Sequence, residues 1–307
     1  MLKSESNIQL PTSLRRQKLK HRNTETPIPI SAFSIQPLAF PTSRRYDWPF
    51  FAGLAILSGV YILLIVAMLV ADLAFTTPHH LLRALASPEI QYSIKLSLIS
   101  CTLTTLLSLW VAVPTGYLMS RQRFPGKRLM DAVLDIPIVL PPLVIGLSLL
   151  ILFQTPPGRA IQRFVPVTYA IPSVILAQFA VACAFAVRTM LVTFDQISPR
   201  CEQVALTLGC NRSQAFWRVA LPEARRGVLT AATLAWARAL GEFGPILVFS
   251  GATRLRTEVL PTSVFLELSI GNIEAAVAVS LIMIVAALAV LTIARLFGLR
   301  TPLERVL

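Results

Sequence analysis

Charged residues are scarce in this chain. Only 14% of its 307 residues are Asp, Glu, Lys or Arg, whereas a typical soluble domain carries about 25%. Residues of the AVILMFWYC set make up 55% of the chain, and its mean hydropathy is +0.68. So few charges cannot cover a water-facing surface, so the composition excludes a soluble protein and predicts an all-α membrane protein.

Residues that bind metals or act as nucleophiles are also few. The four cysteines and three histidines form no CxxC or HxxxH cluster, and the histidines lie outside every long apolar run. The Pro125-Gly126-Lys127-Arg128 segment lacks the upstream glycine and the hydroxyl residue of a nucleotide-binding loop, and no serine lies in G-x-S-x-G. We therefore expect no catalytic residue, no metal site and no cofactor.

Acidic residues are outnumbered, with 15 Asp and Glu against 28 Lys and Arg, which gives a net charge of +13. In a soluble protein this excess would raise the question of a nucleic-acid partner. In a membrane protein its first explanation is basic residues that keep loops in the cytoplasm. We therefore predict no nucleic-acid partner.

Long apolar segments are abundant. A membrane helix needs about 20 mostly apolar residues, and six segments have that length, although the fifth is interrupted by Arg238 and Glu242. The predicted spans are Phe50–Ala71, Leu96–Ser120, Ile136–Pro157 (after an amphipathic start at Leu129–Asp135), Val165–Val187, Val228–Ser250 and Ala275–Ala294.

The distribution of Lys and Arg predicts the orientation of these spans. With the N-terminus in the cytoplasm, the inside segments carry 20 basic residues and the outside segments carry 5, which is a strong positive-inside bias. The inside segments are 1–49, 121–128, 193–227 and 295–307, and the outside segments are 72–91, 154–164 and 251–274. Both termini are thus predicted to be cytoplasmic in a multi-pass protein of a bacterial-type inner membrane.

This topology divides the chain into three parts. Residues 1–49 are predicted to be a disordered basic cytoplasmic tail that contacts anionic membrane lipid. Residues 50–298 form the transmembrane domain, and residues 299–307 form a short cytoplasmic tail.

The cytoplasmic segment 195–227 has the pattern of two short helices joined at a glycine. Ser198-Pro199 is a helix-start signal, and Gly209 can end that helix in a left-handed conformation. Asn211 or Ser213 can cap a second helix, which we expect to end at Leu221-Pro222. The apolar residues of this module either lie against the protein or the lipid headgroups, or form a docking surface for a partner.

The spacing of this module resembles a known motif. It reads Gln203-Val204-Ala205, then Gly209, nine residues, and Val219-Ala220-Leu221-Pro222. This resembles the E-A-A-x-x-x-G-x9-I-x-L-P motif of the permease subunits of binding-protein-dependent ABC importers, except that Gln203 replaces the expected Glu, next to Glu202, and Val204 replaces Ala. The resemblance implies a coupling helix that inserts into a groove of an ATPase subunit. The implied coupling residues are Gln203, Val204, Ala205, Leu208, Gly209, Phe216, Val219, Leu221 and Pro222.

A second motif resembles one branch of this family. The segment Ala235–Gly244 and the downstream Thr257–Pro261 are similar to the fifth membrane segment, and the region after it, of molybdate and sulfate permeases. The resemblance covers roughly residues 90–298 and implies the type I permease fold of ABC importers. It also implies two ABC ATPase subunits, an external solute-binding protein and a second permease copy, which we expect to form a homodimer. The implied substrate is a tetrahedral oxyanion, with molybdate favoured over tungstate and sulfate.

The charges of the fifth span fit a special role. A lone charge near a membrane-helix centre costs about 2.5–3.5 kcal/mol on insertion scales, and Arg238 and Glu242 are four residues apart, so they can partly neutralise each other. Gly241 and Gly244 leave notches for another helix or a solute. The pair, the two glycines and Phe243 therefore either line or gate the translocation pathway, or the pair only stabilises the bundle.

The third span contains three prolines, Pro137, Pro141 and Pro142. Each removes a backbone donor, so Ile136–Gly146 is predicted to kink or unwind. Broken helices occur at membrane depth where protein or a wet cavity satisfies the freed carbonyls. The break is either a hinge or cavity wall, or a passive kink.

Two rival functions remain open. A proton-coupled secondary transporter is expected to carry several ionisable groups at mid-membrane, and only Arg238 and Glu242 qualify here. A permease of the same type for another small solute is the second rival.

Overall fold

The computed structural model describes residues 48–298, and every regular element in that range is a helix. The tails predicted for most of 1–49 and for 299–307 lie outside the described residues. The elements are α2 (Trp48–Phe75), α3 (Pro78–Ala86), α4 (Pro88–Arg121), α5 (Lys127–Val139), α6 (Pro142–Gln154), α7 (Pro156–Gln162), α8 (Ile171–Gln196), α9 (Pro199–Thr207), α10 (Arg212–Ala215), the π-helix η2 (Phe216–Ala220), α11 (Leu221–Glu223), α12 (Arg225–Leu240), α13 (Gly244–Phe249), α14 (Leu260–Ile270) and α15 (Ile273–Gly298).

Helix α2 is described by itself, because the chain divides into two units between Leu63 and Leu64. It begins at Trp48, two residues before the predicted span, and none of its side chains is buried. An apolar helix of 28 residues without buried side chains has the length and composition to cross a membrane.

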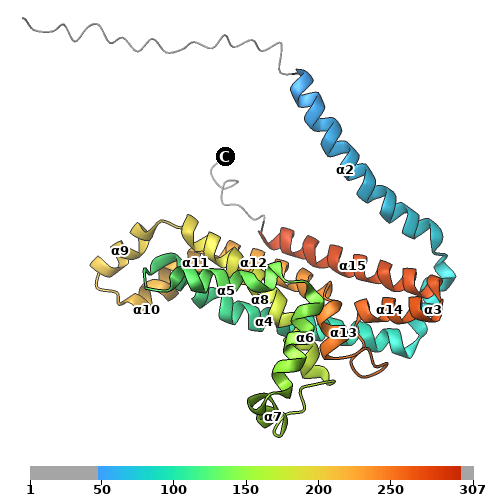
Figure 1. Ribbon diagram of the computed structural model, residues 1–307. Coiled ribbons are helices and arrows are strands. Elements are labelled where there is room, and N and C mark those ends of the chain that lie inside the picture. Colours follow the sequence, from blue (N-terminus) through green and yellow to red (C-terminus); the bar gives the residue numbers. More distant parts are fainter. Residues whose placement is uncertain (1–47, 299–307) are drawn as a thin grey trace, which may run out of the picture. The chain divides into compact units, whose positions relative to one another are not determined.

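Helices α4, α8 and α12 form the centre of the second unit, where α4 and α8 pack along most of their length (Figure 1). The buried face of α4 consists mainly of small residues. A Cβ at Gly116 would lie 2.8 Å from the Cβ of Met190 in α8, so the glycine permits this approach. Small side chains let membrane helices come close together. The small buried residues of α4 include Ser93, Ser97, Ser100, Thr104, Ser108 and Ala112.

Four helices are long and apolar enough to cross a membrane: α2, α4, α8 and residues Ile273–Ile293 of α15. The predicted kink of the third span is confirmed, because α5 ends at Val139 and α6 begins at Pro142 with a bend of 111° between them. Counting this pair as one span gives five.

The fifth predicted span is not one continuous helix. Helix α12 ends at Leu240, residues 241–243 are not helical, and α13 runs only from Gly244 to Phe249. The prediction of a regular helix over Val228–Ser250 is therefore wrong, since two glycines and Pro245 weaken the helix at this point. The total of six crossings stays a prediction.

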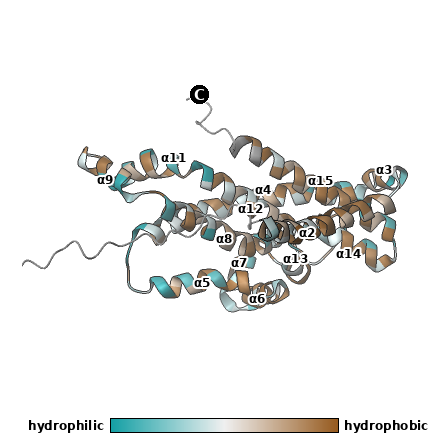
Figure 2. Ribbon diagram, turned by 90° about the horizontal axis from the view of Figure 1, so that it is seen from above, coloured by the Kyte–Doolittle hydropathy of each residue, from teal (hydrophilic) through white to brown (hydrophobic). Residues whose placement is uncertain are grey.

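Hydrophilic residues gather at both ends of the second unit. Figure 2 shows them at one end on α9, on α11 and on the first part of α5, and at the other end on α3 and α14, whereas α15 is mostly hydrophobic.

Candidate functional site

We call residues 195–227 the coupling segment. The helix–glycine–helix pattern predicted there is confirmed for its first helix, α9, and for the glycine that ends this helix. Ser198 caps α9, with its hydroxyl accepting a hydrogen bond from Arg200 N. Gly209 has a φ of +91°, and its N–H donates to Leu206 O while Cys210 N donates to Ala205 O. These two bonds form a Schellman cap, which requires a left-handed residue at the position of Gly209.

The second arm begins as predicted and ends differently. Asn211 and Gln214 form a reciprocal capping box, with bonds of 2.8 and 2.9 Å. The predicted end at Leu221-Pro222 is wrong, since helical structure continues through η2 and α11. Leu221 N donates to Phe216 O, five residues back. A proline removes the regular bond to the fourth preceding residue and crowds its carbonyl, and the wider π-turn accommodates Pro222.

The coupling segment exposes large apolar side chains. Val204 is 58% exposed, Leu208 is 80% exposed and Trp217 is 63% exposed. The other predicted coupling residues divide between the surface and the interior. Gln203, Gly209 and Pro222 are exposed, Phe216, Val219 and Leu221 are half-buried, and Ala205 is buried.

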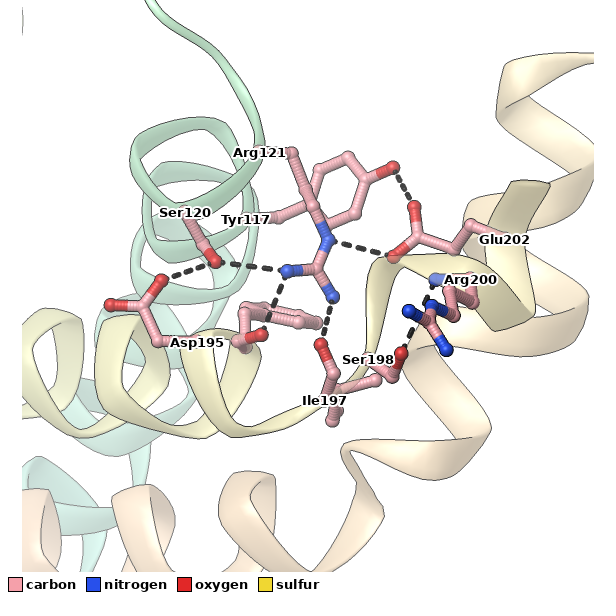
Figure 3. A network of polar contacts seen from close by, with 9 residues as sticks. Tyr117, Ser120, Arg121, Asp195, Ile197, Ser198, Arg200 and Glu202 are labelled. Carbon is pink, nitrogen blue, oxygen red and sulfur yellow. Dashed lines mark hydrogen bonds and ion pairs between the residues drawn. The ribbon is translucent and has the colours of Figure 1, made fainter. Parts of the chain in front are cut away.

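The acidic residue that anchors this segment is Glu202, which the motif alignment did not select. Its Oε1 accepts from Arg121 Nε at 2.8 Å, and its Oε2 accepts from the Tyr117 hydroxyl at 2.7 Å (Figure 3). Glu202 is buried. The signal that could have found it is the helical spacing of α9, which places residue 202 on the same face as the buried Ala205.

The break between α5 and α6 lies against the break between α12 and α13. We call this contact the broken-helix crossing. A Cβ at Gly146 of α6 would lie 2.8 Å from Pro245 Cα of α13. A Cβ at Gly244 would lie 3.1 Å from Leu143 N and 3.2 Å from Pro142 Cβ. Each helix thus places a glycine against a proline of the other, so the backbones touch. The notch predicted at Gly244 is confirmed.

The predicted ion pair lies beside this crossing. Arg238 Nη1 is 2.5 Å from Glu242 Oε1, an ion-pair contact without the alignment of a hydrogen bond. The Glu242 side chain is 1% exposed and that of Arg238 is 29% exposed. The guanidinium also lies 5.4 Å from the ring centroid of Phe185. The pair therefore joins the last turn of α12 to the second residue after the helix.

The remaining predicted pathway residues have different surroundings. Gly241 is exposed, and a Cβ there would meet nothing closer than Ala237 O at 3.7 Å, so it packs against no other helix. The half-buried ring of Phe243 lies 5.3 Å from that of Phe265.

A side chain adds a donor at the end of α12, where Ala239 O also accepts from Glu242 N–H at 3.2 Å. Gln178 of α8 donates to Ala239 O at 3.2 Å, while Thr104 of α4 donates to Gln178 Oε1 at 3.2 Å. Sequence reasoning missed Gln178, whose polarity in the middle of an apolar run was the available signal. These bonds show how the protein satisfies part of a broken helix.

A second ionic cluster attaches α5 to α8. Arg188 Nη1 donates to Asp131 Oδ1 at 2.7 Å, and Arg188 Nε donates to Asp135 Oδ1 at 2.5 Å. The two carboxylates lie four residues apart on one face of α5. Arg188 therefore holds the first half of the bent pair against α8.

A buried acid also lies in the segment predicted to be outside the membrane. Glu258 is 1% exposed, its Oε1 accepts from Ser263 Oγ at 2.8 Å, and its Oε2 has no hydrogen-bond partner. Burial raises the pKa of the Glu258 carboxyl above its ordinary value, and Ser263 and Arg254 offset only part of this effect.

Nothing in the described part of the chain resembles a metal centre. Between residues 48 and 298, no group of three His, Cys, Asp or Glu side chains has a suitable arrangement.

Four apolar helices long enough to cross a membrane, together with one sharply bent pair in the described residues, are typical of a helical membrane protein. Residues 112–301, more than half of the chain, match the family described as binding-protein-dependent transport system inner membrane component. The chain belongs to this family, as its motifs indicated. It is therefore a transport permease of an ABC importer and not an enzyme, since ATP hydrolysis resides in separate subunits.

Two relatives are named as sulfate and molybdenum permeases. The sulfate transport system permease protein CysT of Escherichia coli (strain K12) is 30% identical over 259 residues, which cover 82% of this chain and 94% of that protein. The molybdenum transport system permease protein ModB of Mycobacterium bovis is 33% identical over 223 residues, which cover 71% and 83%. These relatives fall in the branch that the second motif resembles.

A solved structure shares the fold. It is the crystal structure of a bacterial alginate ABC transporter in complex with an alginate pentasaccharide-bound periplasmic protein. The likeness has a TM-score of 0.68 at 17% identity and covers 83% of this chain and 95% of that one. At this identity it supports the fold alone.

Proposed function

We propose that this chain is the membrane-spanning subunit of an ATP-driven inner-membrane importer for a tetrahedral oxyanion, with molybdate favoured over tungstate and sulfate. The observation that carries the proposal is the coupling segment, on which the apolar side chains of Val204, Leu208 and Trp217 are each more than half exposed. An apolar surface at the water-facing end of a membrane protein fits a partner protein. The similarity to the sulfate permease CysT and the molybdenum permease ModB supports the substrate class.

The partners follow from this proposal. Two ABC ATPase subunits bind the coupling segments of two permease copies, and a solute-binding protein delivers the oxyanion from outside. A homodimer is the simplest arrangement, because a two-fold axis lets one chain supply both docking surfaces.

The proposed topology has six crossings with both termini in the cytoplasm. The two broken pairs, α5 with α6 and α12 with α13, each count as one crossing beside the four long helices. In a background without native cysteines, a cysteine in place of Thr253 should react with an impermeant thiol reagent from outside. A cysteine in place of Ser213 should not, although both residues are exposed. The opposite labelling pattern contradicts this orientation.

Arg238, Gly241, Glu242, Phe243 and Gly244 line or gate the pathway in this proposal. The guanidinium of Arg238 is partly exposed next to the uncovered Gly241, so an anion can approach it. Its pairing with Glu242 weakens its attraction for a bound oxyanion, which favours passage over retention. The external binding protein supplies most of the selectivity.

The test is uptake by proteoliposomes that contain the complex of the chain with its ATPase, supplied with binding protein outside. Radiolabelled molybdate should accumulate only with ATP inside, and unlabelled tungstate or sulfate should compete. Uptake that needs a proton gradient and no ATP supports a proton-coupled transporter instead. ATP-dependent uptake of another solute, without oxyanion uptake, contradicts the substrate.

A further inference from the structure

The coupling segment is held to two spans through a single guanidinium. Arg121, the last residue of α4, donates through Nε to Glu202 of α9, through Nη1 to Phe194 O and through Nη2 to Ile197 O, at 2.8, 2.9 and 2.9 Å (Figure 3). The two carbonyls belong to the end of α8, where a helix lacks internal donors. One side chain therefore joins α4, α8 and α9.

The hydrogen bonds of Arg121 span the connection between α8 and α9, where a hinge would otherwise form. Only Ile197 and Ser198 separate α8 from α9, and both have extended backbone conformations. A two-residue extended connection does not by itself fix the angle between two helices. The bond from Arg121 to Ile197 O lies within the connection, and the bond to Glu202 lies beyond it. Both sides of the connection are thus held by the same group.

The second arm of the coupling segment is attached to the same turn of α4. The Tyr117 ring lies 4.7 Å from the ring of Phe216 and 5.4 Å from that of Phe194, and its hydroxyl donates to Glu202. The rings meet edge to face, which is a favourable aromatic geometry. Tyr117 and Arg121 are four residues apart on α4, so they share one face.

The charges of this contact are shielded from water. The side chain of Arg121 is 11% exposed and that of Glu202 is 9% exposed. Removing one member of a buried pair leaves the other without compensation, which makes such a pair sensitive to substitution. The planar guanidinium matches several acceptors at once, whereas a lysine ammonium is a compact point charge.

We propose that Glu202 and Arg121 are positioning residues that make the coupling segment move with α4 and α8 as one body. A displacement imposed by the ATPase on Val204 and Leu208 then reaches the spans without loss at the Ile197-Ser198 connection. The proposal rests on the proposed function. It assigns the acidic role in this segment to Glu202 and leaves Gln203, which is exposed, outside the contact.

The test measures a distance across the contact and the coupling that depends on it. Spin labels replace Thr102 on α4 and Thr207 on α9, both exposed, in a cysteine-replaced chain within the full complex, diluted with unlabelled permease. Distances are recorded without nucleotide and with ATP trapped by vanadate. The unsubstituted complex should keep one narrow distance distribution in both states. Glu202→Gln, which removes the charge and keeps the shape, should broaden it and shift it by several ångströms.

Hydrolysis provides the second readout. In Glu202→Gln the ratio of ATP hydrolysis with loaded binding protein to basal hydrolysis should fall about tenfold or more, the size expected for a lost charge-assisted hydrogen bond. The matched control is Glu223→Gln, the same substitution at an exposed carboxylate of the same segment that lies outside the Arg121 contact. Its ratio and its distances should match those of the unsubstituted complex.

Two results overturn the proposal. One is a distance in the unsubstituted complex that changes between the two nucleotide states, because the segment then hinges. The other is a Glu202→Gln complex with normal distances and a normal hydrolysis ratio. If Glu202→Gln fails to assemble, Tyr117→Phe replaces it as the test, since this variant removes one hydrogen bond to Glu202 and keeps the ring. An unchanged ratio of stimulated to basal ATP hydrolysis in Tyr117→Phe then counts against the proposal. An unsubstituted complex that binds no ATPase contradicts the proposed function instead.

Discussion

The coupling segment and the broken-helix crossing differ in which groups they bury and which they expose. In the coupling segment, the charges of Arg121 and Glu202 are buried while apolar Val204 and Leu208 face outward. In the crossing, glycine and proline backbones are in contact, while Arg238 and Gly241 remain partly or fully accessible. In the proposed function, the first arrangement presents a rigid surface to the ATPase. The second places a close contact next to an accessible charge, which suits a part that opens.

The largest expected effect comes from separating the charges of the crossing. Arg238→Ala leaves the 1%-exposed Glu242 carboxylate unpaired, a change that typically costs about 3–5 kcal/mol. Glu242→Ala should cost less, because the Arg238 side chain retains 29% exposure to solvent. The yield and thermal midpoint of the assembled complex check this order.

The double variant Arg238→Ala/Glu242→Ala serves as the control for this prediction. It should assemble better than Arg238→Ala, because no buried charge is left alone. Single variants that assemble like the unsubstituted chain would show that the two charges reach water separately.

A smaller loss is expected from filling the glycine contact. Gly146→Ala places a methyl group 2.8 Å from Pro245 Cα, and backbone atoms cannot turn aside, so we expect a cost of about 1–3 kcal/mol. Gly241→Ala is the matched control, because its methyl group would lie 3.7 Å from Ala237 O and 3.9 Å from Arg238 O, which are ordinary contact distances. Equal thermal midpoints for the two variants would contradict the close contact of α6 with α13.

A substitution in the exposed apolar surface formed by Val204, Leu208 and Trp217 should lower the affinity for the ATPase and leave the stability of the permease unchanged. Leu208→Ser removes an exposed leucine, and losing a buried leucine at an interface weakens binding by about 1.5–3 kcal/mol. Titration of the ATPase onto the permease should therefore show a Kd roughly 10- to 100-fold higher. Leu82→Ser, at a leucine 66% exposed on α3 in the segment predicted to be outside, should leave this Kd unchanged.

Much of the coupling segment was predictable because its structure is local. The cap at Ser198, the left-handed Gly209 and the capping hydrogen bonds of Asn211 each depend on residues within a few positions. The helical spacing of α9 could indicate that Glu202 is buried, but its partners were not predictable, since they are 81 and 85 residues away on α4. Composition alone could not choose between Glu202 and Gln203.

The crossing was predictable only in part. The prolines indicated the break in the third span, and the spacing of Arg238 and Glu242 indicated their pairing. The contact of Gly146 with Pro245 joins residues 99 positions apart, so no local pattern could show it. The break after Leu240 was missed because its apolar neighbours have the composition of a continuous span.

The smallest expected effect concerns Glu258, outside both regions. Because burial raises its folded-state pKa, the protonated acid is favoured in the fold, and stability is lost as the pH rises from the ordinary carboxyl pKa through the raised one. Glu258→Gln should therefore have a higher thermal midpoint than the unsubstituted chain at pH 8. The difference should shrink toward pH 4, and a difference that grows there would reverse the assigned sign.

The most direct test of the two-region account is the number of oxyanions transported per ATP hydrolysed, measured in proteoliposomes for one variant of each region. Gly209→Val should lose stimulation by loaded binding protein and lose uptake together, because a β-branched residue is costly at a φ of +91°. The Arg238→Ala/Glu242→Ala double variant should keep stimulated hydrolysis and lose uptake, so its transport ratio falls toward zero. A double variant with a normal ratio, or a Gly209→Val complex with normal stimulation and uptake, would contradict the division between a docking region and a pathway region.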